Sequence, residues 1–260
     1  MLYLVSSPST KGDRMRTRYD AIGRTYTATR IPDPRIAHAI DEALGDAGTV
    51  VNVGAGAGAY EPADRLVIAI EPSRTMIDQR RVAGRAVQAI AEALPFPDRA
   101  FDAAMGVLTI HHWSDQLRGL EEATRVARDR VAFLTFDTSV EGFWLTEDYF
   151  PAIARLDREQ LPSIESVAGA LGTQDVRVVD IPADCTDGFL GAFWARPEAY
   201  LDPSVVANMS TFTLMDADER DAGMKRLADD LALGRWDERF GHLRTTTRLD
   251  IGYRLVVASR

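Results

Sequence analysis

The sequence of 260 residues contains a single cysteine, Cys185, and no long apolar run. One cysteine excludes an internal disulfide and any zinc site built from several thiolates. No segment approaches the ~18 consecutive apolar residues that cross a bilayer. The apolar stretch at residues 1–5 is too short for a secretion signal and lacks a basic region before it. We therefore expect a cytoplasmic protein with no membrane partner.

Clusters of positive charge are also missing. The net charge is −9, and no run of Lys or Arg forms a basic patch. Binding of nucleic acid requires a basic face that neutralises phosphates, so we expect no nucleic-acid partner. The composition, 46% hydrophobic and 27% charged, is ordinary for a globular protein. This length allows one large α/β domain with a smaller addition.

The chain instead contains short β-branched runs that alternate with amphipathic segments. Residues 14–29 carry apolar side chains at helical spacing, and a second helix is expected through residues 36–44, with Asp33 as its N-cap. A further helix should begin at Ser73 and reach Arg80. This alternation predicts a doubly wound parallel sheet. The expected strands span residues 49–53, 66–70, 86–90, 101–110 and 131–136.

The pattern changes after residue 137. Residues 139–162 are aromatic and irregular, a short helix runs from Ser163 to Gly172, and a strand follows at 176–181. Residues 183–243 show helical or loop patterns without a strand, and we interpret them as an insertion that covers the cofactor face. A last strand is expected at about 249–258, and residues 1–13 form a loose amino-terminal extension to a domain at 14–260.

The most informative segment is the first strand together with the glycines that follow it. Gly54, Gly56 and Gly58 occupy alternate positions, where the backbone turns sharply and leaves room for a flat group against it. The second strand ends in Glu71. At that edge of an α/β sheet, a carboxylate accepts hydrogen bonds from both hydroxyls of a ribose. The segment therefore predicts an adenosine-containing cofactor.

The glycines fit two cofactor motifs. The dinucleotide fingerprint G-x-G-x-x-G/A ends at Ala59, whereas the G-x-G-x-G of S-adenosylmethionine (SAM) enzymes ends at Gly58. A dinucleotide needs a helix N-terminus for its pyrophosphate. Only seven residues separate Gly58 from the second strand, two of them acidic, which leaves room for one helical turn. SAM carries no phosphate, so this spacing favours SAM over NAD.

Three blocks, at residues 50–58, 69–76 and 91–102, resemble the class I SAM-dependent methyltransferases. The likeness is to the ubiquinone/menaquinone C-methyltransferase-like (type 11) group, and the block Ala91 to Asp102 is its most specific part. The resemblance implies a seven-stranded Rossmann-like sheet with an antiparallel last strand. The segment at 250–255 fits that closing strand.

The resemblance also implies which residues hold the cofactor. The glycine bend would lie against it, Glu71 would hold the ribose, Met76 would flank the adenine, and the backbone around Ala91 and Glu92 would meet the adenine edge. The expected cofactor-binding residues are Tyr26, Arg30, Asn52, Gly54, Ala55, Gly56, Gly58, Glu71, Pro72, Met76, Ala91, Glu92 and Thr109.

Two positions depart from the family pattern. Asn52 stands where the family usually has aspartate, and an amide hydrogen-bonds without contributing charge. Ile90 stands where family members often place the acid that receives the adenine amine. Either cofactor binding is weaker in this chain, or Glu92 takes over that second role.

Candidate catalytic residues follow the fourth strand. Methyl transfer is an in-line displacement, so positioning of the acceptor does much of the catalysis. A base is needed only where the acceptor loses a proton. His111 and His112 lie where the sheet edge meets substrate, and one of them is our candidate base. The alternative is that both merely start the next helix. We expect no metal, because adjacent histidines point apart and no third ligand has suitable spacing.

Two further groups of residues have open roles. Arg30 can pair with the cofactor's carboxylate, and Tyr26 lies in the same amino-terminal segment, which commonly closes over the cofactor in this fold. Aromatic residues of the later segments either line an apolar acceptor site or form the core of the insertion. These aromatic residues are Trp144, Tyr149, Phe150, Phe189, Trp194 and Tyr200.

We therefore expect a SAM-dependent methyltransferase that acts on an O, N or C atom of a small-molecule acceptor, in secondary metabolism or quinone-type biosynthesis. Two alternatives stay open: an NAD-dependent oxidoreductase, and a SAM-binding protein that does not transfer methyl. The acceptor and the oligomeric state do not follow from the sequence.

Overall fold

The computed structural model describes residues 30–80, 85–207 and 209–260. The predicted extension at 1–13 and the predicted helix at 14–29, with Tyr26, lie outside the described residues.

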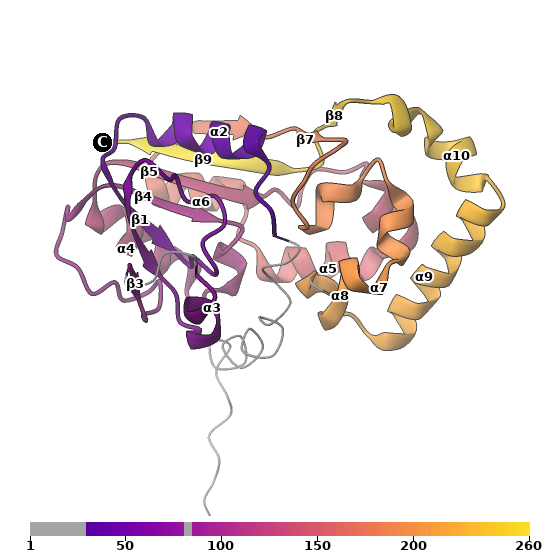
Figure 1. Ribbon diagram of the computed structural model, residues 1–260, viewed down its shortest axis with the longest axis horizontal. Coiled ribbons are helices and arrows are strands. Elements are labelled where there is room, and N and C mark those ends of the chain that lie inside the picture. Colours follow the sequence, from indigo (N-terminus) through magenta and orange to yellow (C-terminus); the bar gives the residue numbers. More distant parts are fainter. Residues whose placement is uncertain (1–29, 81–84, 208) are drawn as a thin grey trace, which may run out of the picture.

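In the described chain, the main strands form one seven-stranded sheet with the order β3-β2-β1-β4-β5-β9-β6 (Figure 1). The first five of these strands in the chain are parallel, and β9 is antiparallel to both β5 and β6. This arrangement confirms the predicted fold class. The strands are β1 (Thr49–Val53), β2 (Leu66–Ile70), β3 (Ala86–Val87), β4 (Phe101–Val107), β5 (Ala127–Phe136), β6 (Asp175–Val178) and β9 (Tyr253–Ser259).

Helices cover both faces of the sheet, which is why its central strands are apolar on both sides. Neighbouring residues of β1 point to opposite faces: Val50 joins the core under α2, and Val51 joins the core under α4 and α6. The helices of the sheet region are α2 (Pro34–Leu44), α3 (Arg74–Asp78), α4 (Gln116–Val126), α6 (Ile164–Leu171) and the 3₁₀ turn η1 (Ile110–His112).

Local capping explains where these helices begin and end. Asp33 accepts a hydrogen bond from the Arg35 N–H at the start of α2, and Ser73 accepts one from the Met76 N–H at the start of α3. Ser163 caps α6 in the same way, and α6 ends at Gly172 in the left-handed conformation. These caps are those that the sequence predicts.

The predicted insertion at 183–243 lies between the two strands of a short antiparallel ribbon, β7 (Ile181–Pro182) and β8 (Arg248–Leu249). It is helical and extends to one side of the sheet, together with two helices that precede it (Figure 1). We call these helices and the insertion the cap. Its elements are the π-helical turn η2 (Leu145–Tyr149), α5 (Pro151–Gln160), η3 (Leu190–Phe193), η4 (Pro197–Leu201), α7 (Pro203–Val206), α8 (Ser210–Leu214), α9 (Ala217–Ala232), α10 (Arg235–Phe240) and η5 (Gly241–Thr245).

The cap has its own aromatic core. Trp144 and Trp194 are fully buried; the indole N–H of Trp144 donates to the Trp194 carbonyl, and that of Trp194 donates to the Ile181 carbonyl, both at 2.9 Å. Edge-to-face contacts join Trp144 to Tyr200 and Trp236. Most of the named aromatic residues therefore form the core of the cap, which is one of the two roles left open by the sequence, whereas Phe189 packs against Tyr253 of β9.

Several predicted boundaries are wrong. The helix after Ser73 ends at Asp78, so Arg80 lies beyond it. The third strand ends at Val87 and not at 90, and the last strand is split into β8 and β9 at Gly252, which has a φ of +103°.

The stretch at 139–162 is not irregular throughout, because it contains η2 and the ten-residue helix α5. Likewise, the strand predicted at 176–181 spans only β6, and β7 pairs separately with β8.

Asp157 in α5 supplies a test of packing in the cap. Burial raises the pKa of this carboxyl from 3.8 to about 7. The native state therefore keeps a proton that the unfolded chain loses near pH 4, and the contribution of Asp157 to stability falls as the pH rises from about 4 to above 7. Asp157→Asn should raise the unfolding free energy at pH 8 by on the order of 2–4 kcal/mol and leave it unchanged at pH 4.

Thermal melts of both proteins at pH 4 and pH 8 measure this effect. Asp175→Asn is the control, because hydrogen bonds and charge from Arg177 lower the pKa of Asp175. That substitution should not stabilise the protein at pH 8. Equal differences between wild type and Asp157→Asn at the two pH values would contradict the assignment.

Candidate functional site

The carboxyl edge of the sheet is shaped by a sharp bend after β1. The backbone N–H groups of Gly54 and Ala55 both donate to the Ile70 carbonyl at the end of β2, each at 2.9 Å. Gly54 and Gly56 have φ values of +70° and +52°, a conformation that residues with a Cβ rarely adopt. The bend therefore folds back over β2, and glycine is required by its conformation.

Gly54 is required for a second reason. A Cβ at this position would lie 1.9 Å from the Oγ1 of Thr109, which is buried just beyond the end of β4. The edges of β1 and β4 thus touch through Thr109, with no room for a larger residue between them. Leu108, just before it, also has a positive φ of +51°. Backbone strain of this kind gathers at functional sites.

Glu71 is placed at the other side of the bend. Its side chain is almost fully buried; one carboxylate oxygen accepts the Gly56 N–H at 2.8 Å, and the other accepts the Ser73 N–H at 2.9 Å. The carboxylate is therefore held rigidly by the backbone, at the edge where the sequence predicts a ribose.

A single cavity of about 990 Å³ joins these groups. This volume is at the upper end of the usual range for small-molecule sites. It contains every predicted cofactor residue of the described part of the chain. These lining residues are Arg30, Asn52, Gly54, Ala55, Gly56, Gly58, Glu71, Pro72, Met76, Ala91, Glu92 and Thr109.

The two histidines are not equivalent in position. Both belong to η1 after β4, and their ring centroids are 3.8 Å apart. His112 lines the cavity, and His111 is not among the described lining residues. Only His112 therefore faces the space in which a cofactor and acceptor would meet.

Glu92 has a structural task. One of its carboxylate oxygens accepts the Ser114 N–H, the Ser114 hydroxyl and the Asp115 N–H, at 2.6, 2.8 and 3.0 Å. These bonds tie the loop after β3 to the start of α4. Ile90 lies on the cavity wall with half of its side chain exposed. The adenine-contacting role of the Ala91–Glu92 backbone stays a prediction.

Arg30 reaches the cavity from the segment before α2. Its guanidinium donates to both carboxylate oxygens of Asp187, at 2.7 and 3.2 Å. The Tyr60 hydroxyl donates to the same carboxylate at 2.8 Å. Burial, followed by the charge of Asp187, raises the pKa of Tyr60 above its ordinary value. The first loop of the cap is thereby bonded to the end of the glycine bend.

Asp33 strengthens the same contact between the cap and the sheet. It accepts the Thr186 N–H at 3.2 Å and a bidentate pair of bonds from Arg35. Burial opposes its ionisation, but these hydrogen bonds outweigh it and lower the pKa of Asp33 to about 2. The carboxylate of Asp33 is therefore charged at neutral pH.

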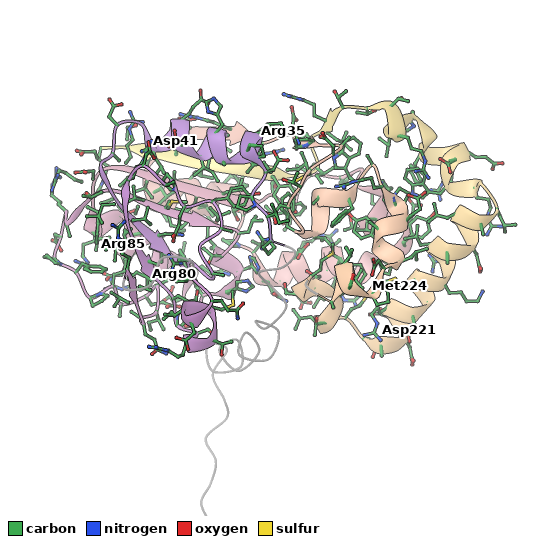
Figure 2. All side chains as sticks on the ribbon, in the orientation of Figure 1. Arg35, Asp41, Arg80, Arg85, Asp221 and Met224 are labelled. Carbon is green, nitrogen blue, oxygen red and sulfur yellow. The ribbon has the colours of Figure 1, made fainter. Side chains whose placement is uncertain are left out.

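Sequence reasoning missed one cluster of the site. Glu61 and Arg80 form a nearly buried ion pair beside the bend, with distances of 2.6 and 2.7 Å, and Asn52 donates to Glu61 at 3.0 Å. The sequence predicts Arg80 within a helix, but it lies just beyond α3 (Figure 2), and its guanidinium donates to the Gly56 carbonyl at 3.2 Å. The sequence feature that could have indicated this cluster is the uncharged Asn52 at a position where the family usually has aspartate, together with the acidic Glu61 in the short connection after the glycines.

The geometry fits SAM and not a dinucleotide. Residues 54–65 contain turns and no helix, so the glycine bend offers no helix N-terminus to a pyrophosphate. Within the described ranges, no cluster of His, Cys, Asp or Glu could hold a metal ion, and no helix is long and apolar enough to cross a membrane.

Comparison with known proteins gives the same result. Residues 51–135 match the methyltransferase domain family. A crystal structure of a candidate methyltransferase from an antibiotic biosynthesis pathway of Anabaena variabilis is 32% identical, with a TM-score of 0.82. That match covers 89% of this chain and 99% of the other. This chain belongs to the class I SAM-dependent methyltransferases.

Two other relatives mark the limits of the likeness. The uncharacterized methyltransferase YcgJ of Bacillus subtilis is 32% identical over 100 residues, which is 34% of this chain and 40% of that protein. The [4+2]-cyclase SpnF shares the fold, with a TM-score of 0.58 and 15% identity over 96% of both chains. SAM is the expected cofactor of this methyltransferase, and nothing in these findings supports the oxidoreductase alternative.

The glycine bend supplies a graded test of the cavity. Gly54→Ala should reduce affinity for S-adenosylhomocysteine (SAH) at least tenfold, because its Cβ would collide with Thr109 and its φ is positive. Gly56→Ala should cost less, because its Cβ would meet only the mobile end of Met76, at 3.3 Å. Calorimetric titration measures both.

Gly169→Ala is the matched control, since a Cβ there meets nothing within 4 Å in α6. It should bind SAH as wild type does. Circular dichroism establishes that each variant is folded. Equal SAH affinity of Gly54→Ala and Gly169→Ala would contradict the placement of the cofactor against the bend.

Proposed function

We propose that this methyltransferase transfers the methyl group of SAM to an O, N or C atom of a small-molecule acceptor. The observation that carries the proposal is the single cavity, which brings together the glycine bend, the carboxylate of Glu71 and the imidazole of His112. Support for a small acceptor comes from the Anabaena relative, because its pathway makes an antibiotic and the likeness extends over 99% of its chain. We place the chain in secondary metabolism on that ground, while a quinone-type acceptor is the other prediction.

In this proposal, Glu71 accepts the ribose hydroxyls, and its orientation is kept by the Gly56 and Ser73 N–H groups. Met76 packs beside the bend, where it would flank the adenine. When bound, SAM supplies a methyl carbon activated by a sulfonium. Arg30 would face the cofactor's carboxylate and is steered by Asp187.

His112 is the proposed base. It follows β4, at the edge where acceptors meet the cofactor in open α/β sheets. A neutral imidazole there can take the proton from a hydroxyl or amine acceptor as the new bond to carbon forms. His111, on the same turn, does not line the cavity and is proposed to act only in packing.

Transfer of labelled methyl from SAM to a panel of phenols, catechols and aromatic amines tests the function. With an acceptor found, His112→Gln should lower kcat at least 100-fold with little change in KM for SAM, because general-base catalysis contributes about 10²–10⁴. The acidic limb of the pH–rate profile should disappear in this variant, because that limb reports protonation of the base.

His111→Gln is the matched control and should retain kcat within about threefold. Equal losses in both variants would contradict the assignment of His112. Binding of SAH without transfer to any acceptor would favour the SAM-binding alternative. Binding of NAD in preference to SAH would contradict the proposed function itself.

A further inference from the structure

A three-residue polar network lies directly beside the glycine bend. Asn52 and the side chain of Arg80 are each only 2% exposed, and the side chain of Glu61 is 14% exposed. The Asn52 amide donates to one oxygen of Glu61 at 3.0 Å. One guanidinium nitrogen of Arg80 donates to both oxygens of Glu61, at 2.7 and 2.6 Å. All three side chains line the cavity.

This network also touches the backbone of the bend. A second guanidinium nitrogen of Arg80 donates to the Gly56 carbonyl at 3.2 Å. The backbone N–H of Gly56 donates to the carboxylate of Glu71 at 2.8 Å. Gly56 is thus held on one side by the proposed ribose carboxylate and on the other by Arg80. A shift of the ion pair would therefore displace the peptide that orients Glu71.

Charge balance explains why position 52 is an amide. Arg80 supplies the single positive charge of the network, and Glu61 supplies the single negative charge. A buried charge without a partner is costly, and two carboxylates at hydrogen-bond distance repel each other strongly. Among the described residues, Arg80 is the cation bonded to Glu61, so a carboxylate at position 52 would repel Glu61, whereas the Asn52 amide donates a hydrogen bond to it.

We propose that Glu61 and Arg80 are positioning residues of the cofactor site. They set the glycine bend through Gly56, and their charge balance requires a neutral hydrogen-bond donor at position 52. The connection at 59–65 contains turns and no helix. The Glu61–Arg80 ion pair therefore braces the glycine bend where a helix would otherwise do so. The proposal rests on the proposed function, since it concerns how the bend receives SAM.

Calorimetric titration with SAH and thermal melts of four proteins test the proposal. Asn52→Asp and Glu61→Gln should each weaken SAH binding at least tenfold, the first by carboxylate repulsion and the second by leaving Arg80 without its counter-charge. The double exchange N52D/E61Q keeps one carboxylate and one guanidinium, and only reverses the hydrogen bond between positions 52 and 61. It should bind SAH within about threefold of wild type.

Asp230→Asn in the cap is the matched control. Asp230 accepts from Arg235 at 2.7 Å and from the Tyr149 hydroxyl at 2.8 Å, and its side chain is 13% exposed. This variant should melt at a lower temperature and bind SAH as wild type does. The contrast separates an effect on the bend from a general loss of stability.

Two results would overturn the proposal. One is a double variant whose loss of SAH affinity equals the product of the fold-losses of the two single variants, because the free-energy effects of independent sites add. The other is a set of folded single variants with unchanged SAH affinity, which would make the pair merely structural. If the wild-type protein bound no SAH, the proposed function would fail. The charge coupling would be rejected separately if the change in melting temperature of N52D/E61Q equalled the sum of the changes in the two single variants.

Discussion

The site depends on one carbonyl oxygen. At the end of β2, the Ile70 carbonyl accepts N–H groups from both Gly54 and Ala55 and so pulls the chain leaving β1 over its neighbour. The next residue after that carbonyl is Glu71, whose carboxylate receives the Gly56 N–H. Two adjacent strand ends are therefore locked together by hydrogen bonds within the chain itself. Such preorganisation reduces the ordering cost of binding.

The glycine bend also accounts for the polar and charged side chains that surround it. A short connection from the glycines to β2 leaves no helix to satisfy or brace the bend. Side chains brace the bend instead. Arg80 donates a hydrogen bond to the Gly56 carbonyl, and the Tyr60 hydroxyl donates one to Asp187 of the cap. In this methyltransferase, the sheet edge, the bend and the first loop of the cap therefore form one bonded unit.

Much of the fold follows from local sequence, because it depends on local interactions. The first two strands, 49–53 and 66–70, match the observed ones residue for residue, since their β-branched runs end at glycine or acid. The caps at Asp33 and Ser163 are equally local. By contrast, Arg80 was misplaced because its side chain is fixed by Glu61, nineteen positions away in the chain. No periodicity reports such a contact.

Part of the cavity lining could also be predicted from the sequence. Its lining follows strand ends that topology brings together, so motif spacing pointed to Gly54 and Glu71, and the family resemblance added Ala91. The distinction between His111 and His112 was not predictable, because it depends on how the η1 turn orients each ring. The role of the cap aromatics also needed the structure, since an apolar side chain suits a ligand site and a core equally well.

The ribbon of β7 and β8 has an evolutionary consequence. Because Ile181 pairs with Leu249, the helical stretch between them leaves and rejoins the fold at a single spot. Segments whose two ends lie close together can be lengthened, shortened or exchanged with little disturbance to the parent domain. The stretch is thus joined to the domain at one place, and its length can change without altering the register of the seven-stranded sheet.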